Sequence, residues 1–168
     1  MRQGIEFFTA TCLNWQPLLQ HENHKQIILN SLTFLVDQKR IWLYGYVIMP
    51  NHVHILWCKQ DDWLHKNVQQ HFSKFTAQQL KFSLLNNSGD INNYKSTQSD
   101  REYQFWERRP YKGTMYNRRI LEEKLDYIHF NPVKAGLCNL PEDYNYSSAR
   151  YYLLNTNNSI LTHYMEHI

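Results

Sequence analysis

The sequence predicts an α+β fold of ferredoxin-like type, in which helices pack on one face of an antiparallel sheet. Segments of strand character and of helical periodicity follow one another in the order strand, helix, strand, strand, helix. The two middle strands are separated only by Pro50-Asn51, which suits a tight turn and therefore an antiparallel hairpin. The chain of 168 residues suits one domain with a single core.

Each predicted element has its own pattern. In the first helix Ile28, Leu32 and Leu35 recur at helical spacing, and the following strands are nearly continuous apolar runs. The second helix is expected to begin at Asp61-Asp62, whose side chains suit a helix start. The position of the last strand is open between 103–108 and 111–116. In chain order the other predicted elements are strand 5–13, helix 22–40, strand 41–49, strand 52–58 and helix 61–85.

The whole chain, 1–168, is predicted to be a single domain with two less regular parts. The stretch 86–100 is rich in Asn, Ser and Asp without periodicity, which predicts a mobile surface loop, and about 153–168 is expected to be a C-terminal tail. The three cysteines are far apart, which argues against a disulfide framework and a structural zinc cluster. No signal-peptide pattern or long apolar run is present, so we expect a cytoplasmic protein without a membrane partner.

Two histidines stand two positions apart on the second hairpin strand. Because side chains alternate along a strand, His52 and His54 project from the same face, together with Leu56 and Cys58. Two imidazoles placed in this way can hold one metal ion. The alternative, two partly buried histidines satisfied by ordinary hydrogen bonds, stays open on this motif alone.

A tyrosine is held away from the core on a later helix, 120–129. Leu121, Leu125 and Ile128 form its apolar stripe, and Tyr127 lies roughly 130° from the centre of that stripe. Pro132 is expected to end the helix. If the last turn stays helical, the side chain of Asn131 lies on the same side as the phenol. The alternative is a surface tyrosine beside an asparagine that caps the helix.

Basic and aromatic residues alternate between positions 101 and 119. Cations that contact phosphates, interleaved with rings that stack on bases, are typical of a surface for single-stranded nucleic acid. The alternative is a solvated loop with a few anchoring aromatics. The candidate DNA-binding residues are Arg108, Arg109, Lys112, Arg118, Arg119, Trp106 and Tyr111.

The stretches "YGYVIMPNHVHILW" and "YIHFNPVKAGL", with "FWERRPY" and "YNYSSARYY", resemble the REP-associated tyrosine transposases, which are single-tyrosine transposases of the HUH endonuclease superfamily. The resemblance covers the chain from about Ile5 to Tyr152. Two positions depart from the pattern: Glu107 stands where a glutamine is usual, and Asn117 stands where an acidic residue is usual.

The resemblance implies a bacterial, nucleoid-associated enzyme that cuts and rejoins single-stranded DNA near hairpin-forming repeats. Tyr127 would be the nucleophile that forms a 5′-phosphotyrosine. His52 and His54 would bind a divalent cation, Mg²⁺ or Mn²⁺, with Asn131 completing the metal shell. His129, inside the tyrosine motif, points roughly 160° away from Asn131 on a helix and is expected to be structural.

Other classes of protein remain open at this point. Another HUH nuclease, a relaxase or a replication initiator, would share the histidine pair. A domesticated protein could bind chromosomal repeat DNA without strand transfer. The sequence leaves open the target DNA sequence and the choice between a monomer and a homodimer.

Overall fold

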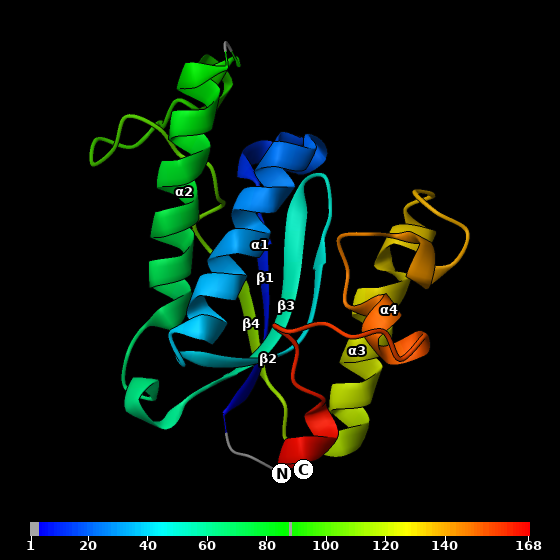
Figure 1. Cartoon of the computed structure of the whole chain (residues 1–168). Helices are drawn as coiled ribbons and strands as arrows, with labels where there is room; N and C mark the ends of the chain where they lie inside the picture. Colours follow the sequence, from blue (N-terminus) through cyan, green and yellow to red (C-terminus); the bar gives the residue numbers. More distant parts are fainter. Residues whose placement is uncertain (1–3, 88) are drawn as a thin grey trace.

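Four antiparallel strands form one sheet in the computed structural model, which describes residues 4–87 and 89–168 (Figure 1). Residues 1–3 of the predicted domain and residue 88 of the predicted polar loop lie outside the described residues. The strand order is β2-β3-β1-β4, with helices after β1 and β3, so the ferredoxin-like fold class is confirmed. The strands are β1 (Ile5–Thr11), β2 (Ile41–Ile48), β3 (His52–Lys59) and β4 (Tyr111–Thr114).

Helices cover both faces of this sheet (Figure 1). As predicted, the first two helices, α1 (Glu22–Asp37) and α2 (Val68–Asn86), pack on one face. The opposite face is covered by α3 (Arg118–Lys134), with the short α4 (Ala149–Leu153) beside it. The reason is that β3 is apolar on both faces. The side chain of Ile55 and the others on its face are buried against α1 and α2, whereas Leu56, on the opposite face, is buried against α3.

The predicted hairpin of β2 and β3 is present, and a glycine on β2 lets α3 pack close to the sheet. The backbone N–H of Met49 donates to the carbonyl of His52 at 2.8 Å, which closes the turn. Farther from the turn, the pairing of β2 with β3 shifts its register between Leu43 and Gly45. A Cβ atom on Gly45 would lie 2.6 Å from Cδ2 of Leu125, so glycine at this position permits the close approach of α3.

The second helix begins later than predicted, and the last strand takes one of its two predicted positions. A short 3-10 turn occupies Asp61–Trp63, and α2 begins only at Val68, where the side chain of Asn67 accepts the N–H of Gln70 at 3.1 Å and caps the helix. The last strand is 111–114, so the alternative at 103–108 is wrong: it forms only isolated bridges.

The prediction that Pro132 ends its helix is also wrong, because α3 continues to Lys134. Proline removes one backbone N–H from the helix, yet the N–H of Ala135 still donates to the carbonyl of Asn131 at 3.1 Å across this turn. The helix ends instead at Gly136, which has a φ of +72°. Its N–H donates to the carbonyl of Val133 at 3.0 Å, and the N–H of Leu137 donates to the carbonyl of Pro132 at 2.9 Å, which together form a Schellman motif.

The two irregular segments contribute to the core instead of lying only on the surface. Within the predicted loop, Tyr94 is buried and its ring stacks on Phe105 at 5.4 Å. Within the predicted tail, Leu161 is buried, and the N–H of Thr162 donates to the carbonyl of Leu43 at 2.9 Å. In the described part of the chain, none of the helices has the length and apolar character needed to cross a membrane.

Candidate active site

The histidine pair lies on the face of β3 that α3 covers. The sheet register pairs His54 with Thr9 and His52 with Thr11 on β1. As strand alternation predicts, the two imidazoles lie together, with ring centroids 4.7 Å apart. His54 is only 4% exposed, whereas His52 is partly open to solvent.

Hydrogen bonds hold one nitrogen of each imidazole ring. Nδ1 of His52 lies 2.7 Å from Oδ1 of Asn51, an acceptor, which favours a proton on Nδ1. Nδ1 of His54 lies 2.7 Å from the Thr9 hydroxyl. Among residues 4–87 and 89–168, the buried Nε2 of His54 has no hydrogen-bond partner. An unpartnered buried nitrogen is unfavourable for folding and is the arrangement expected of a ligand-binding atom.

Both histidines are held in the neutral form. Burial, reinforced by the nearby His52 and Lys124, lowers the pKa of His54 to about 3. Burial also lowers the pKa of His52, against a smaller opposite effect of the hydrogen bond with the side chain of Asn131. Neutral imidazole is the form that binds metals, so both rings are ready to act as ligands near neutral pH.

Tyr127 reaches this pair from α3. Its ring is 40% exposed and lies edge-on to His54, with centroids 5.1 Å apart, and edge-on to Phe7 at 6.1 Å. Because α3 stays helical beyond Pro132, Asn131 lies one turn after Tyr127 and contacts His52. The four residues singled out from the sequence therefore meet at one place between β3 and α3.

Two lysines beside the tyrosine escaped the sequence analysis. The ammonium groups of Lys124 and Lys134 each lie 5.7 Å from the centroid of the Tyr127 ring, and Lys124 also lies 4.9 Å from that of Phe7. The signal was present, because positions three before and seven after a helical residue share its face. Positive charge on two sides of the phenol suits a site that receives an anion.

The donor set fits a divalent cation in part. No cluster of three or more His, Cys, Asp or Glu side chains suited to a metal occurs among the residues that the structure describes. The candidate ligands are instead two imidazoles and the amide of Asn131, a set that leaves room for ligands from a substrate. His129 is buried and its Nε2 lies 2.9 Å from the Ser148 hydroxyl, on the core side of α3, in line with the structural role expected for it.

Trp106 differs from the expectation that it is available for stacking on DNA. It is only 8% exposed, and its indole N–H donates to the Thr76 hydroxyl of α2 at 3.1 Å. The ring is part of the core beneath α2 because this segment bridges to Cys12, directly after β1. Composition alone did not distinguish this buried aromatic from the exposed Tyr111, which lies edge-on to Phe7 at 6.0 Å.

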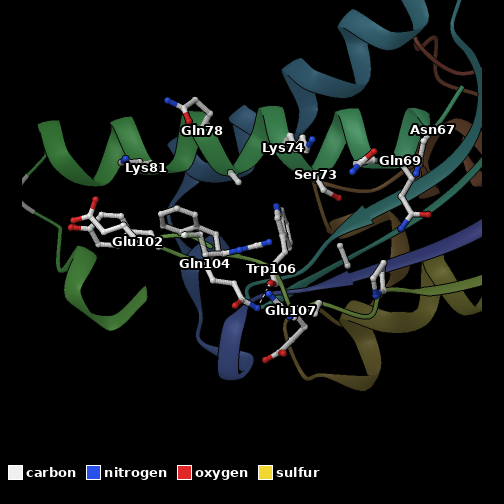
Figure 2. Close-up of a pocket in the computed structure, with 18 of the residues that line it drawn as sticks. Asn67, Gln69, Ser73, Lys74, Gln78, Lys81, Glu102, Gln104, Trp106 and Glu107 are labelled. Carbon is white, nitrogen blue, oxygen red and sulfur yellow. Dashed lines mark hydrogen bonds between the residues drawn. The ribbon is translucent and has the colours of Figure 1, made fainter. Parts of the chain in front are cut away.

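Some of the predicted basic residues border a groove beside α2 (Figure 2). Helix α2 packs on the sheet face opposite to the one that α3 covers and the histidines share. The groove has a volume of about 1060 Å³ and runs between α2 and the segment 101–112. Arg108 and Lys112 line it, but both are paired, with Asp100 at 3.3 Å and with Glu6 at 3.0 Å.

The remaining basic residues are exposed and lie either just before β4 or in the first turn of α3. Arg118 pairs with Glu122 at 2.7 Å, Arg119 approaches Glu123 at 3.8 Å, and Arg109 is exposed just before β4. The basic residues among the candidates are thus spread over the groove, the segment before β4 and the start of α3, whereas Tyr111 lies nearer the site, because its ring contacts Phe7, which contacts both His54 and Tyr127.

The two departures from the family pattern have roles in the structure. The side chain of Asn117 accepts the N–H of Ile120 at 3.0 Å and caps α3. A carboxylate oxygen of Glu107 accepts the N–H of Asn14 at 2.7 Å, which ties the loop after β1 to the segment before β4.

Comparisons with known proteins give a related sequence and a related structure, while no family model matches the chain. A Haemophilus influenzae protein named "Putative REP-associated tyrosine transposase" is 32% identical over 103 residues, which are 60% of this chain and 54% of that protein. The chain thus matches about half the length of this relative. A solved structure described as a REP-associated tyrosine transposase bound to a REP hairpin matches with a TM-score of 0.63 and 17% identity, covering 96% of this chain and 90% of the other. The resemblance found in the sequence is therefore confirmed: the chain is related to a protein named as a REP-associated tyrosine transposase and shares the fold of a solved one.

Proposed function

We propose that the protein is a metal-dependent endonuclease and strand transferase for single-stranded DNA, a transposase that acts near hairpin-forming repeats. The observation that carries the proposal is the contact of the Tyr127 ring with the ring of His54, at a centroid distance of 5.1 Å, where Nε2 of His54 has no hydrogen-bond partner among the described residues. A hydroxyl nucleophile beside two neutral imidazoles suits attack on a phosphodiester. The relationship to a named transposase supports the same reaction class.

Tyr127 would attack the phosphorus of one phosphodiester. The bond between the phenolic oxygen and phosphorus forms as the bond from phosphorus to the 3′ oxygen breaks. The phenol gives up its proton, the departing 3′ oxygen gains one, and the strand is left with a free 3′-OH and a 5′-phosphotyrosine. Attack by another 3′-OH reverses the step and joins strands without a nucleotide cofactor.

The residues around Tyr127 would bind and orient the phosphate. Lys124 and Lys134, on two sides of the ring, offer ammonium groups to the phosphate oxygens that develop charge. His52, His54 and Asn131 would hold a divalent cation, which when bound supplies further positive charge to the scissile phosphate. We propose Mg²⁺ or Mn²⁺, because DNA oxygens would add the hard ligands that these cations prefer.

The exposed basic residues would contact DNA away from the reacting phosphate. Arg109, Arg118 and Arg119 are open to solvent, and Tyr111, 56% exposed beside Phe7, is placed to stack on a base near the site. Arg108 and Lys112 would need to exchange their carboxylate partners for phosphates. Trp106 is left out of this role because it is buried.

The test uses single strands that contain hairpin repeats of the host genome, incubated with Mg²⁺ or Mn²⁺ and separated on a denaturing gel. DNA labelled at its 3′ end should form a covalent adduct, whereas DNA labelled at its 5′ end should give a shorter free fragment. Tyr127→Phe should abolish the adduct, whereas Tyr116→Phe, a change at a tyrosine that is 79% exposed, should leave it intact.

Two further variants test the proposed role of His52 and His54 in binding metal. His52→Ala with His54→Ala should abolish the adduct, and His65→Ala, at an exposed histidine, should not. Adduct formation by Tyr127→Phe would refute the assignment of Tyr127 as the nucleophile. Specific repeat binding without an adduct for any metal or strand tested would refute the enzymatic proposal and favour a protein that only binds repeat DNA.

A further inference from the structure

Trp15 stands at the open side of the histidine pair. It follows β1 by a few residues, and the end of β1 is paired in register with His52. Its ring is 62% exposed and lies edge-on to the His52 ring, with centroids 5.9 Å apart at an interplanar angle of 65°. An indole with this exposure contributes little to the core and leaves most of its surface open to solvent beside the histidine pair.

The backbone at Trp15 also has an unusual conformation. Asn14 and Trp15 both have left-handed conformations, with φ values of 54° and 57°. Asparagine adopts this conformation fairly often, but for a bulky aromatic residue it is a genuine outlier. Such conformations persist only where surrounding contacts impose them, and they gather at functional sites.

The contacts that impose this conformation come from the segment before β4. The N–H of Asn14 donates to the carboxylate of Glu107 at 2.7 Å, a charge-assisted hydrogen bond. The N–H of Leu13 donates to the carbonyl of Phe105 at 2.8 Å, and the N–H of Glu107 donates to the carbonyl of Thr11 at 2.7 Å. These bonds hold the loop at three positions directly before Trp15, and the indole lies outward with most of its surface exposed.

We propose that Trp15 is a stacking platform for a nucleobase of single-stranded DNA, next to the phosphate that lies against His52 and His54. This inference rests on the proposed function, because it takes that phosphate as given. A base extends from the sugar beside its phosphate, so an exposed indole face beside the phosphate site meets the base of an adjoining nucleotide. Stacking on an aromatic face tolerates every base and suits an unpaired strand. Glu107 is the positioning residue, since it holds the loop through Asn14.

The experiment measures the binding of fluorescent single strands to the full chain by anisotropy, with one base at a time removed to leave an abasic sugar. The wild-type protein should show one position, next to the cut site, where loss of the base weakens binding by about tenfold. In Trp15→Ala, binding of the intact strand should weaken by about the same factor, and base removal at that position should have no further effect. Trp15→Phe should restore much of the sensitivity.

Two further variants separate stacking from general damage. Phe75→Ala, at a ring 50% exposed on α2 on the other side of the sheet, should keep the wild-type pattern. Glu107→Ala should reduce the sensitivity at the same position, and Glu107→Gln, which keeps an acceptor, should preserve it.

The outcomes for this inference and for the proposed function differ. If Trp15→Ala keeps the wild-type response at every abasic position, the platform is refuted, even where covalent adducts form. If the position-specific loss depends on Trp15 but no adduct forms, the platform stands and strand cleavage is refuted. If the wild-type protein binds no single strand, both are refuted.

Discussion

The ring of Tyr127 lies edge-on to the ring of His54, with centroids 5.1 Å apart, although one residue is on α3 and the other on β3. The contact exists because Gly45 on the neighbouring strand leaves room for Leu125, which draws α3 onto the sheet. Two predictions concern groups at this contact, and two concern the stability of the fold.

Thr9 should control the affinity of the site for metal. Its hydroxyl holds Nδ1 of His54 at 2.7 Å and thereby orients Nε2. Thr9→Val keeps the shape but removes this bond, and loss of such a partner weakens metal binding by roughly 10- to 100-fold. Manganese titration followed by electron paramagnetic resonance measures the affinity. Thr33→Val, which removes a hydroxyl bonded to the Leu29 carbonyl on α1, should bind manganese as the wild type does, and equal affinities for all three proteins would contradict the role of Thr9.

Lys124 and Lys134 should contribute phosphate contacts that depend on salt. Each alanine variant should bind single-stranded DNA more weakly and lower the slope of log affinity against log salt concentration by about 0.7, the value for one phosphate contact on a single strand. Anisotropy titrations over a salt series give the slope. Lys95→Ala, at an exposed lysine remote from Tyr127, should keep the wild-type slope, and a similar slope for all variants would show that these ammonium groups bind no phosphate.

His24 should make the stability depend on pH. It is buried, with Nδ1 at 2.7 Å from the Leu18 carbonyl and Nε2 at 3.0 Å from the Ser83 hydroxyl. Burial lowers the pKa of His24 below its ordinary value of 6.5. The unfolded chain therefore binds a proton at a higher pH than the folded chain. The stabilisation from the neutral form is present above pH 6.5 and is lost as the pH falls below that value, by at most about 1.4 kcal/mol per pH unit.

Urea unfolding of the wild type and of His24→Gln at pH 7.5 and 5.5 measures this effect. Other histidines titrate in both proteins, so the difference between the two pH dependences isolates His24. The wild type should lose more free energy of unfolding on acidification than the variant does. Parallel losses would show that His24 is not the titrating group.

Gly136 should be needed for the end of α3. At a φ of +72°, a side chain with a Cβ is strained, so Gly136→Ala should lower the free energy of unfolding by about 1 kcal/mol. Asparagine tolerates this conformation better, and Gly136→Asn should cost less. Thermal and urea unfolding measure both variants. An alanine variant as stable as the wild type would contradict the left-handed helix end.

The sequence predicted most of the sheet and the approximate place of the site. Alternation placed the two histidines on one face of a strand, and helical periodicity kept Tyr127 off its own apolar stripe. Both inferences concern neighbours in the chain, where geometry repeats with a fixed period. The helix end at Pro132 was wrong because a local rule competed with a helix end that Gly136 supplies further on.

Features that depend on distant segments were less accessible to the sequence. Trp106 and Tyr111 have similar neighbours in the chain, yet one is under α2 and the other is exposed beside Phe7. Tyr94 lies in a polar stretch, yet it belongs to the core because Phe105 folds against it. In each case the partner comes from another segment of the chain, and no periodicity links the two.

By itself the sequence determined that a histidine pair shares one strand face and that a tyrosine shares one helix face with an asparagine, since backbone geometry fixes such relations between near neighbours. Only the tertiary structure decided that these two faces meet, that Lys124 and Lys134 lie beside the phenol, and that Trp15 is held outward beside His52. These relations depend on how α3 and the loop after β1 pack on the sheet, which is a balance of apolar burial and hydrogen bonding over the whole chain.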